Sequence, residues 1–255
     1  MLVDSVGPSV TPTPSWWLDR LAAAAPLDRL PASADVVIIG GGMTGCATAH
    51  WLHRSLGQDC LVLDARGVAG GATGRNGGHL WPRPESTFET QTAEELLAFI
   101  HSSQTECDLT VGAGTAALER REPLADVAYH DSWDDMEASG GEGDDWGGDD
   151  VATWGEDECR RRLGTEAFSS ASHFPGGAQF FPAKVAAALL QHSGATLAAP
   201  VRVQEIIRRG ARSIVRTDVG SVEARAVVVA TNGCETSGIR THPRARTRRP
   251  AATRA

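Results

Sequence analysis

Residues Asp35-Val-Val-Ile-Ile-Gly-Gly-Gly-Met-Thr-Gly45 decide the fold of this chain. The run from Asp35 to Gly40 is continuously apolar after its first residue and rich in β-branched residues, which is typical of a strand buried on both faces of a parallel sheet. The following glycines fit the pattern G-x-G-x-x-G, and Met43–Leu56 has a composition that favours a helix. A second apolar run, Gln58–Leu63, completes a β–α–β unit of about thirty residues, the length that such a unit needs.

The glycines and the acid that follows them predict a dinucleotide site. Gly40 permits a tight turn, Gly42 lets a pyrophosphate approach the backbone, and Gly45 lets helix and strand pack closely. The helix N-terminus offers N–H groups and a positive dipole end to the phosphates. Asp64, nineteen residues after Gly45, can accept hydrogen bonds from both hydroxyls of the adenosine ribose. The glycine pattern alone would also suit an ordinary loop, but its context favours a dinucleotide, and the acid disfavours the 2′-phosphate of NADP.

The next stretch favours FAD over NAD. Residues 66–80 form a glycine-rich segment with five glycines between Gly70 and Gly78, together with Thr73, Arg75 and Asn76. Such a loop can run along the pyrophosphate and ribityl chain of a longer cofactor and donate backbone N–H groups to it. Nicotinamide enzymes usually enter a helix at this point instead.

Composition excludes several classes of protein. The formal net charge of −8 argues against nucleic acid as a general partner. Five widely spaced cysteines without a C-x-x-C pair predict neither a disulfide framework nor structural zinc, and indicate a reducing compartment. The N-terminus has no secretory signal, and the apolar stretch 21–27 is too short to span a bilayer. We therefore expect a cytoplasmic protein with no membrane partner.

The rest of the chain predicts an FAD-binding domain that is built from separate pieces. A Pro- and Ala-rich arm, residues 1–32, carries a tryptophan pair that we expect to dock onto the body. A helical pattern covers 91–120, and another helix, Phe180–Gln191, opens at Pro182. Short strands are then expected at Pro200–Ile207, Ser213–Asp218, Ser221–Ala224 and Ala226–Ala230.

Two segments have extreme charge. Residues 131–158 are rich in Asp, Glu and Gly and contain no Lys or Arg, which indicates a solvated and partly disordered insertion. A lid or a docking site for a cationic partner is the alternative for this insertion. Residues 240–255 are rich in Arg, contain no acid and show no apolar periodicity, and we expect a disordered basic tail there.

The sequence resembles the D-amino-acid oxidase-like FAD-dependent oxidoreductases, in particular the branch that includes gamma-glutamylputrescine oxidases. The resemblance rests on Pro14–Asp19, Ala34–Gly45, Gly71–His79, Ala178–Pro182 and Val227–Gly233. It implies an α/β fold, with a Rossmann-like FAD-binding domain at 33–90 and 182–239 and part of a β-rich substrate domain at 91–181. It also implies oxidation of a C–N bond of a small amine or amino acid by hydride transfer to the flavin, with oxygen as the usual acceptor.

The resemblance and the motifs together give the candidate cofactor-binding residues. The glycine motif and the end of the second strand supply Gly40, Gly41, Gly42, Met43, Thr44, Gly45, Asp64, Ala65 and Arg66. The resemblance implies that the glycine-rich loop and two later strands add Ala72, Thr73, Arg75, Asn76, Gly77, Gly78, Val203, Ala230 and Thr231. Residue Val203 would give backbone contacts to the adenine.

The sequence does not identify a catalytic residue or a metal site. His79 could face the flavin or be satisfied by a backbone group, and the other histidines show no metal-ligand spacing. Because the flavin carries the hard chemical step, no strongly activated side chain is required. Members of the family usually run well beyond this length, so we expect C-terminal truncation. The alternatives are an FAD-binding fragment without turnover and an NAD-binding protein of another class.

Overall fold

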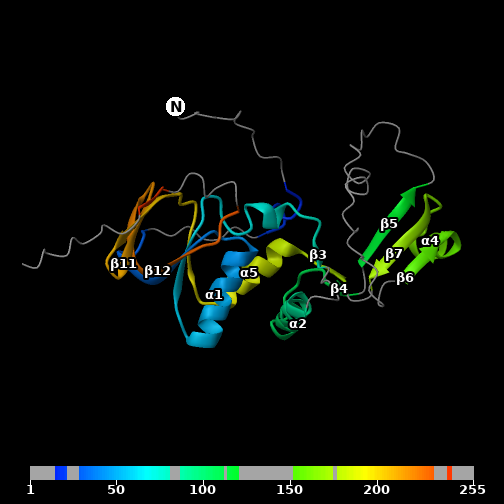
Figure 1. Cartoon of the computed structure of the whole chain (residues 1–255), viewed down its shortest axis with the longest axis horizontal. Helices are drawn as coiled ribbons and strands as arrows, with labels where there is room; N and C mark the ends of the chain where they lie inside the picture. Colours follow the sequence, from blue (N-terminus) through cyan, green and yellow to red (C-terminus); the bar gives the residue numbers. More distant parts are fainter. Residues whose placement is uncertain are drawn as a thin grey trace, which may run out of the picture. The chain divides into compact units, whose positions relative to one another are not determined.

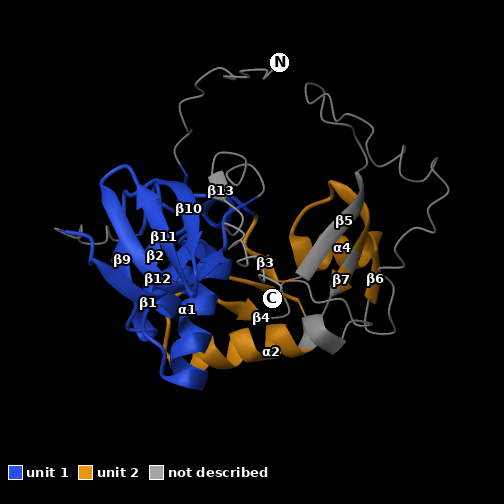
Figure 2. Cartoon of the chain, turned by 60° about the vertical axis from the view of Figure 1, so that its left-hand side comes forward, with its two compact units in different colours: residues 1–76, 182–255 blue, residues 77–181 orange. Residues whose placement is uncertain are grey.

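The computed structural model describes residues 15–21, 29–80, 87–111, 114–120, 152–174, 177–232 and 240–242. They belong to two compact units, one of residues 1–76 and 182–255 and the other of residues 77–181 (Figure 2). The first unit is therefore assembled from separate segments of the chain. That these units bind the cofactor and the substrate, respectively, stays a prediction.

The first unit is built on a seven-stranded sheet (Figure 1). Its strands are β1 (Ser33–Ile39), β2 (Cys60–Leu63), β9 (Thr196–Ala198), β10 (Val203–Arg209), β11 (Arg212–Thr217), β12 (Gly220–Val229) and β13 (Arg240–His242). Their order in the sheet is β13-β10-β11-β12-β1-β2-β9. The pairs β12–β1, β1–β2 and β2–β9 are parallel, whereas the pairs β10–β11 and β11–β12 are antiparallel. This mixed sheet with helices confirms the predicted α/β fold.

The centre of the sheet is the apolar core of the unit. Val37 and Ile38 of β1 have no exposed surface, and all four residues of β2 are buried. Strand β1 pairs with β12 on one side and β2 on the other, so both of its edges are hydrogen-bonded. Each fully buried Val or Ile side chain contributes about 1.5–3 kcal/mol relative to an exposed one. The continuous apolar runs predicted these two buried strands correctly.

Two helices of this unit, α1 (Met43–Leu56) and α5 (Pro182–His192), pack against each other (Figure 1). Helix α1 ends because Gly57 adopts φ 61°, a left-handed conformation that suits glycine, and its N–H donates to the His53 carbonyl. Helix α5 begins at Pro182, two residues later than the predicted start at Phe180. A short 3₁₀ turn, η1 (Ala72–Gly74), lies in the glycine-rich loop.

Two expectations for the C-terminal strands were wrong. Strand β12 is continuous where we expected two strands, because Arg225 points outward and its guanidinium bonds Gln58 Oε1 at 2.9 Å without interrupting the ladder. The expected disordered tail begins with a strand, since Arg240–His242 pair in parallel with β10. Strand pairing uses backbone groups, so the absence of apolar periodicity did not reveal β13. Residues 243–255 lie outside the described residues.

In the described part of the second unit, short antiparallel sheets are accompanied by the helices α2 and α4. Its elements are β3 (His79–Leu80), α2 (Thr87–Ser102), β4 (Thr110–Val111), β5 (Gly114–Arg120), β6 (Ala152–Gly155), α4 (Glu156–Leu163), β7 (Phe168–Phe174) and β8 (Ala178–Gln179). The strands form two sheets, in the orders β3-β8-β4 and β5-β7-β6.

The helical pattern predicted over 91–120 was wrong in its second half. Helix α2 ends at Ser102, and Gln104 takes a left-handed backbone conformation with φ 51°. Beyond it, β4 pairs with β8, and β5 pairs with β7 over most of its length. These partners lie 48 to 69 residues away in the sequence, so a local apolar spacing could not show the pairing.

The C-terminal end of the acidic segment is ordered, contrary to our expectation for residues 152–158. Trp154 of β6 is buried with Cys159 of α4 and Ala171 of β7, and its ring stacks on His173 with centroids 4.5 Å apart. A buried tryptophan supplies enough apolar area to fix this segment. Residues 131–151, for which a lid or a docking site was the alternative, lie outside the described residues.

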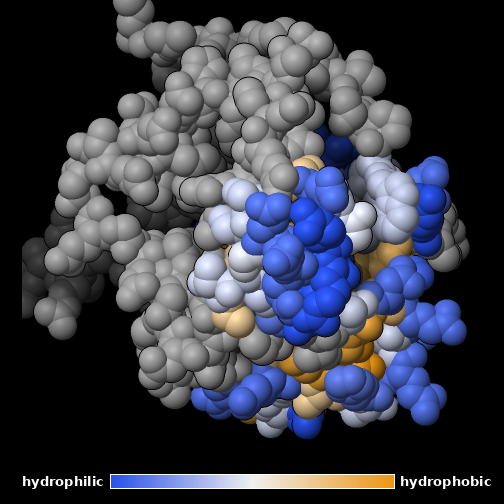
Figure 3. All heavy atoms as spheres, turned by 90° about the vertical axis from the view of Figure 1, so that its right-hand side faces the viewer, coloured by the Kyte–Doolittle hydropathy of each residue, from blue (hydrophilic) through white to orange (hydrophobic). Residues whose placement is uncertain are grey.

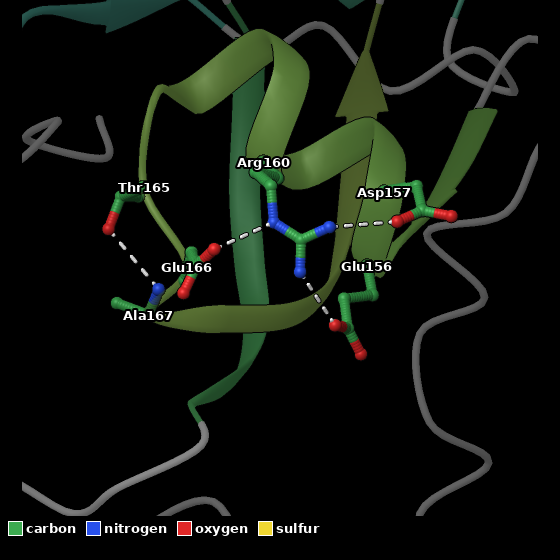
Figure 4. Close-up of polar contacts among 6 residues, drawn as sticks. All are labelled: Glu156, Asp157, Arg160, Thr165, Glu166 and Ala167. Atoms are coloured by element: carbon green, nitrogen blue, oxygen red, sulfur yellow. Dashed lines mark hydrogen bonds and ion pairs between the residues drawn. The ribbon is translucent and has the colours of Figure 1, made fainter.

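The acidic residues of α4 pair with basic residues of the same helix. Arg160 makes ion pairs with Glu156 at 3.0 Å, with Asp157 at 2.9 Å and with Glu166, beyond the helix, at 3.0 Å (Figure 4). These groups are exposed, and such pairs typically contribute 0–1 kcal/mol each. Figure 3 shows hydrophilic side chains gathered in a patch, with apolar surface beside it. The charges therefore form a solvated, locally neutralised surface.

Candidate functional site

A cavity of about 360 Å³ opens where three parallel strands of the first unit end. Gly40 follows β1, Asp64 follows β2, and Ala230 follows β12, so the carboxyl ends of these strands meet at one place. In α/β sheets this edge is where ligands bind. The cavity is lined by Gly40, Gly42, Met43, Thr44, Asp64, Arg66, Gly71, Ala72, Thr73, Ala230, Thr231 and Asn232.

Two glycines are required by the backbone around this cavity. Gly40 has φ 115°, and a Cβ atom there would stand 2.6 Å from the Ala230 carbonyl oxygen. A Cβ atom on Gly45 would stand 1.9 Å from the Gly40 carbonyl oxygen, a distance that no side chain can adopt. These two positions hold β1, α1 and the end of β12 in close contact, which agrees with the packing role inferred from the sequence.

The N-terminus of α1 faces the cavity. Its N-cap residue, Gly42, provides no side-chain hydrogen bond, and the first turn contains no acidic residue. The Met43 N–H donates to Thr73 Oγ1 at 2.9 Å, so a hydroxyl from the glycine-rich loop occupies the helix end. A Cβ atom on Gly42 would stand 3.2 Å from that hydroxyl. The positive end of the helix dipole therefore lies at a narrow opening suited to an anion.

The Asp64 carboxylate accepts three backbone N–H groups from two segments, the first glycine turn and the residues that follow β2. Its Oδ2 accepts the Gly41 N–H at 2.7 Å, and its Oδ1 accepts the N–H groups of Arg66 and Gly67 at 2.7 and 2.8 Å. Two carboxylate oxygens offer about four acceptor positions. Roughly one position is therefore left for a ribose hydroxyl, fewer than the two that the sequence suggested. Asp64 thus shapes the site as well as lining it.

The glycine-rich loop returns to the first glycine turn. Its Ala69 is fully buried with φ 57°, and the Ala69 N–H donates to the Gly41 carbonyl at 2.8 Å. The loop then forms η1, where the Asn76 side-chain amide bonds the carbonyls of Ala72 and Thr73 at 3.3 and 3.1 Å. These bonds place Thr73 at the cavity wall.

A second, smaller cavity of about 40 Å³ adjoins the same strand ends. It is lined by Ile39, Gly40, Leu63, Asp64, Ala65, Val201, Arg202, Val203 and Thr231. Gly40, Asp64 and Thr231 line both cavities. The smaller one brings Val203, the predicted adenine contact, close to the acid that was predicted to bind the ribose.

The structure brings together most of the predicted cofactor residues, although their binding role stays a prediction. Twelve of the eighteen line one or both cavities; Gly41, Gly45, Arg75 and Asn76 lie in the first unit but are not among the lining residues. Gly77 and Gly78 belong to the second unit. The prediction missed six lining residues, although Gly71 and Asn232 adjoin motifs that were recognised. The six are Ile39, Leu63, Gly71, Val201, Arg202 and Asn232.

Other candidate groups gain no catalytic role from the structure. The side chain of His79 is exposed, so the two alternatives for it are not decided by burial. Burial and the nearby Asp64 charge raise the pKa of the Cys46 thiol to about 12, which keeps it protonated and unreactive. Within the described ranges, no group of three or more His, Cys, Asp or Glu residues could hold a metal ion. None of the described helices is long and apolar enough to cross a membrane.

Comparison with known proteins agrees with this geometry. The profile of a family described as FAD dependent oxidoreductase (DAO) matches residues 35–251. The probable oxidoreductase OrdL of Rhizobium meliloti is 26% identical over 88% of this chain and 55% of the relative. The gamma-glutamylputrescine oxidoreductase of Escherichia coli is 25% identical over 86% of this chain and 54% of the relative. The chain thus spans about half the length of these curated relatives.

Solved structures show the same fold. Glycine oxidase from Bacillus cereus superimposes with a TM-score of 0.59 and 20% identity, over 80% of this chain and 57% of that chain. At this level of identity the likeness concerns the architecture of the backbone. It supports the arrangement of strands and helices around the cavity.

Proposed function

The chain belongs to the FAD-dependent oxidoreductase family, whose cofactor is FAD, and from this premise we propose that its protein uses FAD to oxidise the C–N bond of a small amine or amino acid. In the overall reaction, the amine, oxygen and water give a carbonyl compound, ammonia or a smaller amine, and hydrogen peroxide. The observation that carries the proposal is the cavity at the ends of β1, β2 and β12, with a helix N-terminus and a carboxylate at its wall.

The residues of the cavity fit a dinucleotide. At Gly42 a Cβ atom would narrow the opening between α1 and Thr73, so the glycine keeps backbone N–H groups accessible to a pyrophosphate. The free acceptor position of Asp64 would bind a ribose hydroxyl of the adenosine half, and the small cavity beside Val203 would take the adenine. Thr73 and the η1 backbone would continue along the cofactor toward the flavin.

In this proposal the main role of the protein is to hold FAD and to orient it. Bound FAD supplies the two-electron acceptor for oxidation of the C–N bond. The α1 dipole and the backbone N–H groups at its N-terminus would stabilise the pyrophosphate charge of a bound cofactor, because they are fixed in advance and point at one place. Asp64 and Gly40 set the spacing between the strand ends, which fixes where the cofactor lies.

The amine or amino-acid substrate class is supported by relatives. One relative is named for gamma-glutamylputrescine, and one solved neighbour is a glycine oxidase. Both names refer to a nitrogen compound, an amine derivative in one case and an amino acid in the other. The glycine motif and the α1 N-terminus support the FAD part of the proposal, and the names of the two relatives support the substrate class.

The proposal is tested by anaerobic reduction of the FAD-loaded protein. Candidate primary amines, secondary amines and amino acids are mixed with the protein, and loss of the oxidised flavin absorption is followed. Matched alcohols and hydroxy acids, with oxygen in place of nitrogen, serve as controls. We expect bleaching by at least one nitrogen compound and peroxide release once oxygen is admitted. Bleaching by the hydroxy compounds alone would refute the C–N proposal while leaving the FAD site intact.

A further inference from the structure

The N-terminal tryptophan segment forms an ordered turn in the first unit. The Asp19 N–H donates to the Ser15 carbonyl at 3.0 Å, and the Leu21 N–H donates to the Leu18 carbonyl at 3.1 Å. The guanidinium of Arg20 lies 4.0 Å from the centre of the Trp16 ring. Ser15–Leu21 therefore has internal contacts that fix its shape, and we refer to it as the tryptophan turn.

The tryptophan turn contacts the cofactor loop at consecutive places. The Ser15 hydroxyl donates to the Gly74 carbonyl, and Trp17 Nε1 donates to the Asn76 carbonyl at 2.7 Å. Leu18 packs so closely on Gly74 that a Cβ atom there would stand 2.8 Å from Leu18 Cδ2. The two hydrogen bonds join residues 59 positions apart in the sequence.

The same loop is held from the cavity side by α1. Thr73 Oγ1 accepts the Met43 N–H at 2.9 Å, at the helix end that faces the cavity. The η1 turn is therefore bonded on one side to α1 and on the other to the tryptophan turn. Removing the outer contacts would take away one of the supports of the loop, which is also held by Thr73, by its own internal hydrogen bonds and by the packing of η1 against α5.

We propose that Ser15, Trp17 and Leu18 are positioning residues of the FAD site, which hold the Ala72–Asn76 loop closed against the cofactor. The inference rests on the proposed location of FAD in the cavity that Ala72 and Thr73 line. A ligand held there leaves more slowly when the loop cannot swing away. The turn therefore controls how long the cofactor stays bound, without touching the reacting atoms.

The effect should appear in FAD release. Trp17→Phe keeps an aromatic ring but removes the N–H that bonds the Asn76 carbonyl. Loss of one such hydrogen bond should speed FAD release about 3- to 10-fold, measured by recovery of flavin fluorescence after dilution. Ser15→Ala should act in the same direction. Trp16→Phe is the matched control. The Trp16 ring packs against Trp17 and Arg20 inside the turn, phenylalanine keeps an aromatic ring there, and the Trp17 N–H is left in place, so this variant should release FAD at the wild-type rate.

A second measurement needs no bound cofactor. In the FAD-free protein, trypsin cleavage after the exposed Arg75 should be faster in Trp17→Phe than in Trp16→Phe, with cleavage after Arg208 in β10 unchanged. A purely structural role would instead raise cleavage at both sites and lower the melting temperature. Failure of wild type to bind FAD would refute the proposed site. Normal FAD binding with equal release and equal Arg75 cleavage in the two variants would overturn the positioning role.

Discussion

Replacing Asp64 with Asn or Ala should weaken FAD binding for two separable reasons. In the first place, the carboxylate offers an acceptor to a ribose hydroxyl. In the second, it accepts three backbone N–H groups, from Gly41, Arg66 and Gly67, at 2.7–2.8 Å. Losing a charged acceptor costs about 1–3 kcal/mol. In FAD affinity this corresponds to about a 5- to 150-fold increase in Kd.

The two substitutions divide these contributions. Asp64→Asn keeps one oxygen, which can still accept the N–H groups of Arg66 and Gly67, but it places an amide near Gly41 and removes the charge. Asp64→Ala removes all three acceptors and should also loosen the loop after β2. We therefore expect the Ala variant to have the weaker FAD affinity and the lower melting temperature, whereas the Asn variant loses affinity with a smaller change in stability.

The assay is a titration of FAD fluorescence with each purified variant. Asp35→Asn is the matched control: Asp35 lies in β1 toward its other end, is exposed and faces Arg225 at 3.7 Å, so the same charge is lost outside the cavity. We expect wild-type affinity in this control. An Asp64→Asn protein that stays folded and binds FAD with unchanged Kd would refute the role of Asp64.

Three further predictions follow from the glycine positions and one histidine. Gly42→Val should abolish FAD binding in a folded protein, since the valine side chain fills the opening at Thr73. The control is Gly155→Val, which should bind FAD normally in the same titration. Gly155 is also a helix N-cap with the same backbone conformation, and it has open space around it. Gly45→Ala should lower the free energy of unfolding, measured by urea titration, by about 3 kcal/mol or more, because its Cβ would meet the Gly40 carbonyl. The control is Gly155→Ala, which should change stability little because nothing lies near that position. Burial, and then the nearby charges of Arg54, His192 and His53, lower the pKa of His50 in the folded protein. As the pH falls, this histidine is therefore protonated in the unfolded chain before it is protonated in the folded one, and the free energy of unfolding should fall below about pH 6.5. In urea titrations at acidic and neutral pH, His50→Gln should lose less stability on acidification than wild type, and an equal loss in the two proteins would contradict this.

The sequence predicted the β1–α1–β2 part of the first unit because the signals there are local. The strand before Gly40, the glycine spacing and the acid at Asp64 lie within thirty residues, so short-range rules describe them. Where the structure depends on distant partners, prediction failed: β5 pairs with β7, and β13 pairs with β10, through backbone contacts that leave no periodic pattern. The buried Trp154 likewise lay in a segment whose acidic composition suggested disorder.

The candidate site divides in the same way. The glycines and Asp64 came from a motif, whereas Arg202 joins the smaller cavity because of a contact between distant segments. Strand β9 pairs with β2, and just after β9 the Val201 N–H donates to the Asp64 carbonyl at 2.8 Å, which brings Arg202 to the end of β2. The second hydrogen-bonding role of Asp64, toward three backbone N–H groups, also appears only in the folded structure. The spacing of residues in the sequence can therefore predict which residue lies near a ligand. It does not show how many hydrogen-bond acceptors of that residue are already used within the protein.

The most direct test of the account is a competition titration on the purified chain. FAD is titrated into protein stripped of cofactor, alone and with excess ADP or NAD. If the cavity at the ends of β1, β2 and β12 holds the adenosine half of FAD, one FAD should bind per chain, and ADP should weaken its apparent affinity. NAD should compete less well than ADP, and Gly42→Val should remove binding. Preferential binding of NAD, or FAD binding that neither ADP nor Gly42→Val disturbs, would contradict the central claim.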